Sequence, residues 1–204
     1  MVTKIKKKIV VEGDEDKDNL GLVHVITGDG RGKTTSSLGL AVRALGSNLR
    51  VYMIQFLKSG NTGEIYIIEK HLQGMDIEQF GVDAVRERQK KLDQFRDKGS
   101  KFVFKPDEEE KGAAMVGFHH AQRIINSKAY DMVILDEINV ILDKGLIPMK
   151  EVLDLIENHG NVELVFTGRD APEEIIEKAD YVQNIKSIKH PWQKGIKARK
   201  GIEY

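Results

Sequence analysis

Short apolar runs alternate with amphipathic segments along most of the chain, from about residue 22 to residue 185. Apolar runs that end at glycine or at charged residues are typical of buried strands. Apolar residues that recur every three or four positions, as in Leu38, Ala41 and Leu45, are typical of helices that pack on a sheet. The pattern predicts strands at 22–27, 51–57, 77–80, 132–135, 162–167 and 181–185, and helices at 34–45, 64–72, 82–98, 113–125, 148–157 and 172–178.

This alternation predicts an α/β fold. Strands separated by helices form right-handed β-α-β units, in which a parallel sheet is covered by helices on both faces. No repeat and no Gly-, Ser- or Pro-rich linker divides residues 21–204, which we interpret as a single domain. The charged residues 1–20 have little apolar periodicity, and we interpret them as a flexible N-terminal tail.

Composition narrows the class of protein. The 204 residues carry 32 Lys and Arg against 32 Asp and Glu, so the net charge of zero argues against a general binder of nucleic acids or membrane surfaces. The absence of cysteine excludes disulfides, thiolate nucleophiles and cysteine-ligated metal centres. No run is long enough to span a bilayer and no signal peptide is visible, so a cytoplasmic protein is expected.

A glycine-rich segment connects the strand at 22–27 to the helix at 34–45, and it reads Gly28-Asp29-Gly30-Arg31-Gly32-Lys33-Thr34-Thr35. This context is the one that a phosphate-binding loop (P-loop) requires. Glycines let backbone N–H groups turn around an anion, and the helix directs its positive end to the same place. Lys33 would add a charge and Thr34 a hydroxyl ligand for Mg²⁺. Thr27 stands where the usual motif has its first glycine, and a simple glycine-rich turn is the alternative.

A second motif is the apolar strand at 132–135, which ends in Asp136 and Glu137. Carboxylates in this position lie at the carboxyl edge of a parallel sheet, where ligands bind in open α/β folds. In a P-loop protein they hold Mg²⁺ directly or through water. The alternative is an acidic pair that only terminates the strand or caps the next helix.

Two arginines are weaker candidates. Arg169 follows the strand at 162–167, and Arg43 lies two to three turns into the helix after the P-loop. Either could contact a phosphate. Taken alone, however, an arginine in such a position is more often a surface or interdomain residue than a ligand contact.

Taken together, these residues and the end of the chain resemble the P-loop type of ATP:corrinoid adenosyltransferase. The resemblance covers about residues 22–204. Besides the two motifs and Thr167-Gly168-Arg169, it rests on Arg43-Ala44-Leu45-Gly46, Gln55-Phe56-Leu57-Lys58, Lys189-His190-Pro191-Trp192, Gly195-Ile196-Lys197-Ala198 and Gly201-Ile202-Glu203-Tyr204. The last of these stretches is the most specific.

The resemblance implies transfer of the 5′-deoxyadenosyl group of ATP to the Co(I) centre of cobalamin or another corrinoid, with release of triphosphate. It also implies a three-layer RecA-like P-loop fold with a mostly parallel sheet, Mg²⁺ dependence and a homodimer. By matching positions, residues 28–35 with Arg43 and Arg169 would bind ATP. Lys33, Thr34 and Glu137 would be catalytic, and Thr34, Asp136 and Glu137 would hold the metal.

The resemblance also assigns a corrinoid site. Phe102 and Phe104 match an aromatic pair that lies under the corrinoid and displaces its lower axial ligand, which makes Co(II) easier to reduce. The second aromatic is commonly Trp in the family, and the alternative is that both residues pack in the core. Residues 82–101 look like an insertion relative to the family.

Two expectations follow about partners and alternatives. Without cysteine or a flavin motif the chain cannot supply the electron for cobalt, so an external reductant such as a reduced flavoprotein is implied. A P-loop ATPase or kinase that transfers the γ-phosphoryl group is the alternative enzyme, and a nucleotide-binding regulatory module is the alternative without catalysis.

Overall fold

The computed structural model of the protein describes residues 17–58, 60, 62–81 and 108–203. They contain one sheet, whose strands are β1 (Val23–Thr27), β2 (Val51–Phe56), β3 (Met75–Phe80), β4 (Met132–Asp136), β5 (Glu163–Thr167) and β6 (Tyr181–Asn184). Every pairing is parallel and the strand order is β3-β2-β4-β5-β1-β6. The sheet therefore needs crossover connections, and helices supply most of them.

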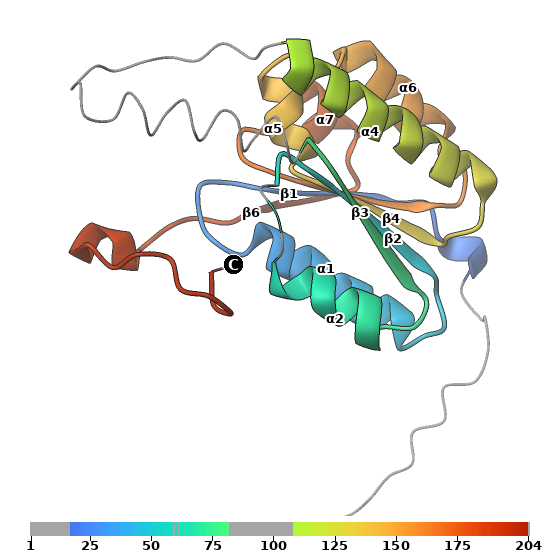
Figure 1. Ribbon diagram of the computed structural model, residues 1–204. Helices are drawn as coiled ribbons and strands as arrows, with labels where there is room; N and C mark the ends of the chain where they lie inside the picture. Colours follow the sequence, from blue (N-terminus) through green and yellow to red (C-terminus); the bar gives the residue numbers. More distant parts are fainter. Residues whose placement is uncertain (1–16, 59, 61, 82–107, 204) are drawn as a thin grey trace, which may run out of the picture.

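The helices cover both faces of this sheet (Figure 1). α1 (Lys33–Leu45) and α2 (Gly63–His71) lie on one face. α4 (Glu108–Ser127), α5 (Ile138–Asp143), α6 (Met149–Asn158) and α7 (Glu173–Lys178) lie on the other. Two short 3₁₀ helices, Lys17–Asn19 and Pro191–Lys194, complete the described structure.

The central strands are buried on both faces, which explains their continuous apolar sequences. β2, β4 and β5 have no exposed residue. Their side chains divide between a larger core under α4–α7, which contains Phe118 and Phe166, and a smaller core under α1 and α2, which contains Met53 and Ile134. This arrangement confirms the expected three-layer α/β fold with a parallel sheet.

All six predicted strands are present, and five of the six predicted helices have a counterpart. The helix predicted at 113–125 begins earlier, at Glu108, where three glutamates in its first turn suit the positive end of the helix dipole. The surface helix predicted at 82–98 lies outside the described residues. α5 was not predicted, because its sequence is apolar on most sides and follows a strand directly. Lys17–Asn19, which the sequence assigned to the tail, form a 3₁₀ turn, and Lys17 pairs with Asp131 at 3.2 Å.

This topology brings the carboxyl ends of β1, β4 and β5 together beside the first turn of α1. Ligands of parallel α/β sheets bind at this edge. Within the described ranges, no helix has the length and apolar character needed to cross a membrane.

Candidate nucleotide-binding site

The loop after β1 is built around glycine. Gly28 and Gly32 have φ angles of 102° and 114°, which L side chains rarely adopt. A Cβ atom at Gly28 would lie 2.4 Å from both Asn184 Oδ1 and the carbonyl oxygen of Ile185. The loop is also tied to the chain after β6, because Gly30 N donates to Ile185 O at 2.7 Å. Glycine is thus required here by conformation and by space, and the loop leads directly into α1.

Lys33 is the first residue of α1 and curls back over this loop. Its ammonium donates to the carbonyl oxygens of Gly28 and Gly30, both at 2.8 Å. Burial lowers the pKa of Lys33, although Glu137 nearby works in the opposite direction. An anion in the loop would offset this desolvation, so the site favours a negatively charged ligand.

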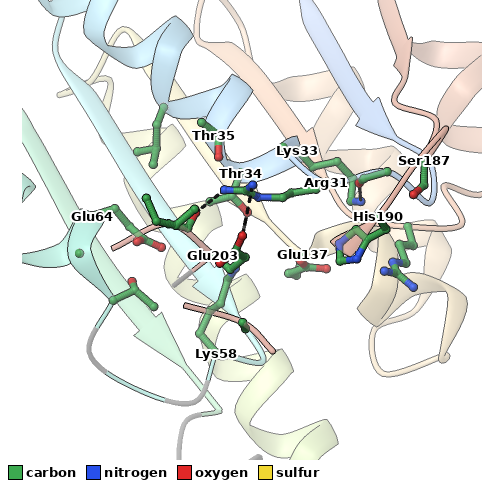
Figure 2. Close-up of a pocket in the computed structure, with 18 of the residues that line it drawn as sticks. Arg31, Lys33, Thr34, Thr35, Lys58, Glu64, Glu137, Ser187, His190 and Glu203 are labelled. Atoms are coloured by element: carbon green, nitrogen blue, oxygen red, sulfur yellow. Dashed lines mark hydrogen bonds and ion pairs between the residues drawn. The ribbon is translucent and has the colours of Figure 1, made fainter. Parts of the chain in front are cut away.

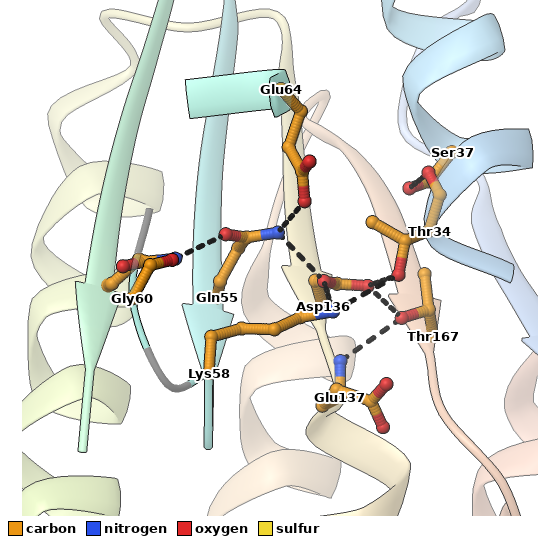
Figure 3. A network of polar contacts seen from close by, with 10 residues as sticks. Thr34, Ser37, Gln55, Lys58, Gly60, Glu64, Asp136, Glu137 and Thr167 are labelled. Carbon is orange, nitrogen blue, oxygen red and sulfur yellow. Dashed lines mark hydrogen bonds and ion pairs between the residues drawn. The ribbon is translucent and has the colours of Figure 1, made fainter. Parts of the chain in front are cut away.

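Asp136, at the end of β4, is the centre of a polar network and is fully buried (Figure 3). Its Oδ1 accepts hydrogen bonds from the hydroxyls of Thr34 at 2.9 Å and Thr167 at 2.5 Å. Its Oδ2 accepts from Gln55 Nε2 at 3.1 Å and forms an ion pair with Lys58 at 3.2 Å. Four donors from four elements or loops therefore saturate this carboxylate.

Glu137, the next residue, is placed differently. Its φ and ψ of 68° and 16° lie in the left-handed region, and its N–H donates to Thr167 Oγ1 at 3.0 Å. Among the described residues, none forms a hydrogen bond or ion pair with its carboxylate, which faces the cavity (Figure 2). Burial, followed by the charge of Asp136, raises the pKa of Glu137. A carboxylate in this condition gains from a bound cation.

These oxygens fit a magnesium ion by their chemistry. Mg²⁺ takes hard oxygen ligands, often one or two from the protein and the rest from phosphates and water. Thr34 and Glu137 line the same cavity and supply a hydroxyl and a carboxylate, and Asp136 accepts a hydrogen bond from the Thr34 hydroxyl. In the described ranges there is no group of three or more His, Cys, Asp or Glu that would hold a metal without such help.

A cavity of about 1110 Å³ opens above these groups (Figure 2). The P-loop, the start of α2, the ends of β4 and β5 and the C-terminal segment all contribute to its walls. Most of the predicted ATP-binding residues line it, namely Asp29, Gly30, Arg31, Gly32, Lys33, Thr34, Thr35 and Arg169, together with Glu137. Gly28 and Asp136 lie just behind this surface, through their contacts with Lys33 and Thr34.

Arg43 lies away from the cavity, and two other predicted residues lie outside the described part of the chain. Arg43 is exposed in the last turn of α1, about 15 Å along the helix from Lys33, and does not line the cavity. The structure therefore does not bring Arg43 to the other candidate ATP contacts. Phe102 and Phe104, the expected corrinoid contacts, lie outside the described residues.

The C-terminal segment closes one side of the cavity. The Arg31 guanidinium donates to the carbonyl oxygen of Ile202 and lies 3.5 Å from the Glu203 carboxylate. Arg199 donates to Glu203 through its backbone and its guanidinium, and these hydrogen bonds lower the pKa of Glu203 to about 2. Asp29 in the P-loop accepts from Ser187 N at 3.1 Å. The far end of the chain is thus part of the site.

The structure places several residues here for which the sequence predicts no role. Lys58, Glu64, His190, Trp192 and Glu203 all line the cavity. The only signal for most of them was the resemblance of the C-terminal stretches and of Gln55-Phe56-Leu57-Lys58, which marked these segments without saying what they do.

Comparisons with known proteins agree with one another. Residues 19–204 match the sequence model of the family described as "ATP:corrinoid adenosyltransferase BtuR/CobO/CobP". A protein of Sinorhizobium sp named corrinoid adenosyltransferase is 33% identical over 204 residues, with 98% of this chain and 86% of the relative covered. Proteins of the same name from Pseudomonas aeruginosa and Escherichia coli K12 are 31% and 28% identical, and 98% of this chain is covered in both, with 92% and 94% of the relatives. Domain III of the replication initiation protein DnaA from Thermotoga maritima aligns with 86% of this chain and 64% of that one, at 11% identity and a TM-score of 0.37, a likeness too low to support any conclusion.

Proposed function

This chain belongs to the ATP:corrinoid adenosyltransferase family, and we propose from that premise that the cavity over the P-loop binds ATP with its triphosphate at the first turn of α1. The protein transfers the adenosyl group of ATP to a corrinoid. The observation that carries the proposed site is the convergence of Lys33, Thr34 and Glu137 on one cavity floor.

The triphosphate would lie against the backbone N–H groups of the P-loop. The loop turns through Gly28 and Gly32, and α1 directs its positive end into the cavity. The Lys33 ammonium would donate to phosphate oxygens, either in place of the two carbonyl oxygens that it now contacts or in addition to them. Arg31 and Arg169 line the same cavity and would add positive charge around the polyanion.

A magnesium ion would be held by Thr34 and Glu137 together with phosphate oxygens. When bound, it would neutralise negative charge that develops on the triphosphate as it leaves. Asp136 would then orient the Thr34 hydroxyl rather than bind the ion directly, because both of its oxygens are already occupied.

The transfer itself needs no general base. The electron pair of Co(I) forms the bond to C5′ of ATP, the C5′–O bond breaks, and its electron pair leaves with the triphosphate. No proton moves in this step, so a site without a histidine–carboxylate dyad suffices. The task of the protein is to align the three reacting atoms and to stabilise the leaving polyanion, for which Lys33 and the loop amides are placed.

The corrinoid side of the reaction rests on resemblance. We propose that Phe102 and Phe104 contact the corrinoid, that an external reductant such as a reduced flavoprotein supplies the electron, and that the enzyme is a cytoplasmic homodimer. With Phe104→Ala, activity from pre-reduced Co(I) should survive better than activity from Co(II), because only the second needs the axial ligand removed. Equal losses in the two assays would exclude that role.

The remaining alternative is transfer of the γ-phosphoryl group, which P-loop sites commonly catalyse. ATP labelled in its adenosine separates the two reactions, because the label enters the corrinoid only if C5′ is attacked. If C5′ is attacked, ATP labelled at the γ-phosphate gives labelled triphosphate. Labelled orthophosphate or phosphorylated product, with no label in the corrinoid, would favour the alternative.

A further inference from the structure

A lysine lies next to one of the two proposed magnesium ligands. The Lys58 ammonium lies 3.2 Å from Asp136 Oδ2 and 3.5 Å from Thr34 Oγ1. Its side chain is 22% exposed, whereas that of Asp136 is fully buried. Figure 3 shows the side chain reaching across the end of β2 toward Asp136 and Thr34. One positive charge of the protein therefore lies beside Thr34, a proposed Mg²⁺ ligand, and against the Asp136 carboxylate that orients this hydroxyl.

The backbone holds Lys58 in this position. β2 ends at Phe56, and Leu57 then takes a left-handed conformation with φ 54°, which is uncommon for a residue other than glycine. The N–H of Leu57 still bonds to the carbonyl oxygen of Phe80 at 3.1 Å, so the turn is anchored to β3. This turn directs Lys58 over the carboxyl edge of the sheet. Strained conformations of this kind concentrate at functional positions.

Gln55 connects Asp136, the partner of Lys58, to polar side chains farther from Lys58. Gln55 donates to Asp136 at 3.1 Å and accepts from Gln79 at 2.9 Å, and it also lies 3.4 Å from Glu64. Asp136 is thus held in place by Gln55 as well as by Lys58. A divalent ion bound to Thr34 would be repelled by the Lys58 ammonium, which lies 3.5 Å from the same hydroxyl oxygen.

We propose that Lys58 is a resident cation that keeps free divalent ions out of the site, and that the triphosphate of ATP draws it away so that the metal binds together with the nucleotide. A flexible four-carbon stem can carry the ammonium from Asp136 to a phosphate oxygen within the same cavity. Lys58 then contributes to binding of the polyanion, and Asp136 keeps its hydrogen bond from Thr34. This inference rests on the proposed magnesium site.

The test measures the affinity of the nucleotide-free protein for Mn²⁺. Electron paramagnetic resonance detects the ion that remains free. Lys58→Met removes the charge and keeps the length of the side chain, so Mn²⁺ affinity should rise by at least about tenfold. Lys58→Arg should bind Mn²⁺ as weakly as the unaltered protein. Lys70→Met is the matched control, because Lys70 is an exposed lysine of α2, and it should have no effect. If Lys58→Met fails to fold, Lys58→Gln serves in its place.

Unchanged Mn²⁺ affinity in Lys58→Met would overturn the inference. So would tighter binding that survives addition of Glu137→Gln to Lys58→Met, because the ion would then lie elsewhere. The proposed metal site is checked separately, by Mn²⁺ binding to the unaltered protein in the presence of ATP. If the protein binds no Mn²⁺ in the presence of ATP, the proposed metal site is wrong and so is the role of Lys58. If it does bind Mn²⁺ with ATP, but Lys58→Met leaves the Mn²⁺ affinity of the nucleotide-free protein unchanged, only the inference about Lys58 is wrong.

Discussion

The Thr34 hydroxyl donates a hydrogen bond of 2.9 Å to Asp136 Oδ1, although the two residues are 102 positions apart in the chain. This contact joins the first turn of α1 to the end of β4. It places the threonine of the P-loop against the acidic end of the strand. Glu137, the next residue after Asp136, lines the cavity. The two motifs of the sequence therefore form one site.

Thr34→Ala should impair metal-dependent turnover, because it removes a proposed Mg²⁺ ligand and leaves Asp136 Oδ1 with one donor fewer. We expect kcat to fall by about 100-fold, which corresponds to about 2.7 kcal/mol of barrier, and the Mg²⁺ concentration for half-maximal rate to rise. Thr34→Ser keeps the hydroxyl and should stay within about threefold of the unaltered enzyme. A Thr34→Ala enzyme with the normal Mg²⁺ dependence would remove Thr34 from the metal site.

Lys33→Met should slow adenosyl transfer because the ammonium is placed to stabilise the leaving triphosphate. Loss of one such donor typically lowers kcat by about 10²–10³-fold, or about 2.7–4 kcal/mol. Single-turnover rates with pre-reduced corrinoid and saturating ATP report this step directly. The exposed Lys70→Met change is the control for loss of a positive charge. A normal single-turnover rate in Lys33→Met would contradict the proposed role.

Gly117→Ala should destabilise the protein, although alanine is normally the better helix former. A Cβ atom at Gly117 would lie 2.7 Å from a ring carbon of Phe56 and 2.8 Å from Phe80 Cγ. Overpacking of this kind costs about 1–3 kcal/mol of unfolding free energy, more than the gain of about 0.5–1 kcal/mol in helix propensity. Urea denaturation measures the difference.

The same helix offers the control for this substitution. Gly112 is exposed in α4, and a Cβ atom there would meet nothing within 4 Å. Gly112→Ala should therefore raise the unfolding free energy by about 0.5–1 kcal/mol. Equal effects at both positions would show that the packing of α4 on Phe56 and Phe80 is not as described.

A buried glutamate far from the cavity gives a pH-dependent prediction. Glu163 accepts hydrogen bonds from His24 at 2.6 Å and from the N–H groups of Gly21 and Leu22 at 2.9 and 3.0 Å. Burial alone would raise the pKa of Glu163, but these hydrogen bonds outweigh it and the pKa is lowered. A lowered carboxyl pKa stabilises the fold above the unfolded value of about 4.3, and this stability is lost as the pH falls through the folded value.

Glu163→Gln should therefore cost about 1–2 kcal/mol at pH 7, and the difference from the unaltered protein should shrink below about pH 4. Denaturant unfolding at several pH values measures this. Glu157→Gln breaks only the exposed pair with Lys178 and should change stability by less than about 1 kcal/mol at any pH. A Glu163→Gln effect that persists undiminished at low pH would contradict the ionic origin of the contact.

The sequence predicted the strands and the cavity floor because both depend on local patterns. Buried parallel strands are apolar throughout, and the glycines of the P-loop are demanded by the φ angles at positions 28 and 32. α5 is missing from the prediction because its sequence is apolar on most sides and follows β4 directly, and the turn between them comes from the left-handed conformation of Glu137, which has no glycine to mark it. The alternation of strands and helices predicts a parallel sheet with all carboxyl ends at one edge, but it does not predict which strands are neighbours.

The sequence does not predict contacts between distant segments that depend on the course of a loop. Lys58 reaches Asp136 only because Leu57 turns the chain back at the end of β2. Glu203 reaches Arg31 because the last segment returns to the P-loop after β6. Arg43, by contrast, is a predicted contact that the structure does not place at the cavity, because it lies in the last turn of α1, far from the loop at the start of this helix.

Adenosyl transfer by this protein can be tested by the stoichiometry of a single reaction. The protein is mixed with ATP, Mg²⁺ and chemically reduced corrinoid, the visible spectrum records adenosylcorrinoid, and phosphorus NMR identifies the phosphate product. We predict one triphosphate for each adenosylcorrinoid formed, and loss of both products together in Lys33→Met. Formation of ADP without an adenosylcorrinoid spectrum would contradict adenosyl transfer.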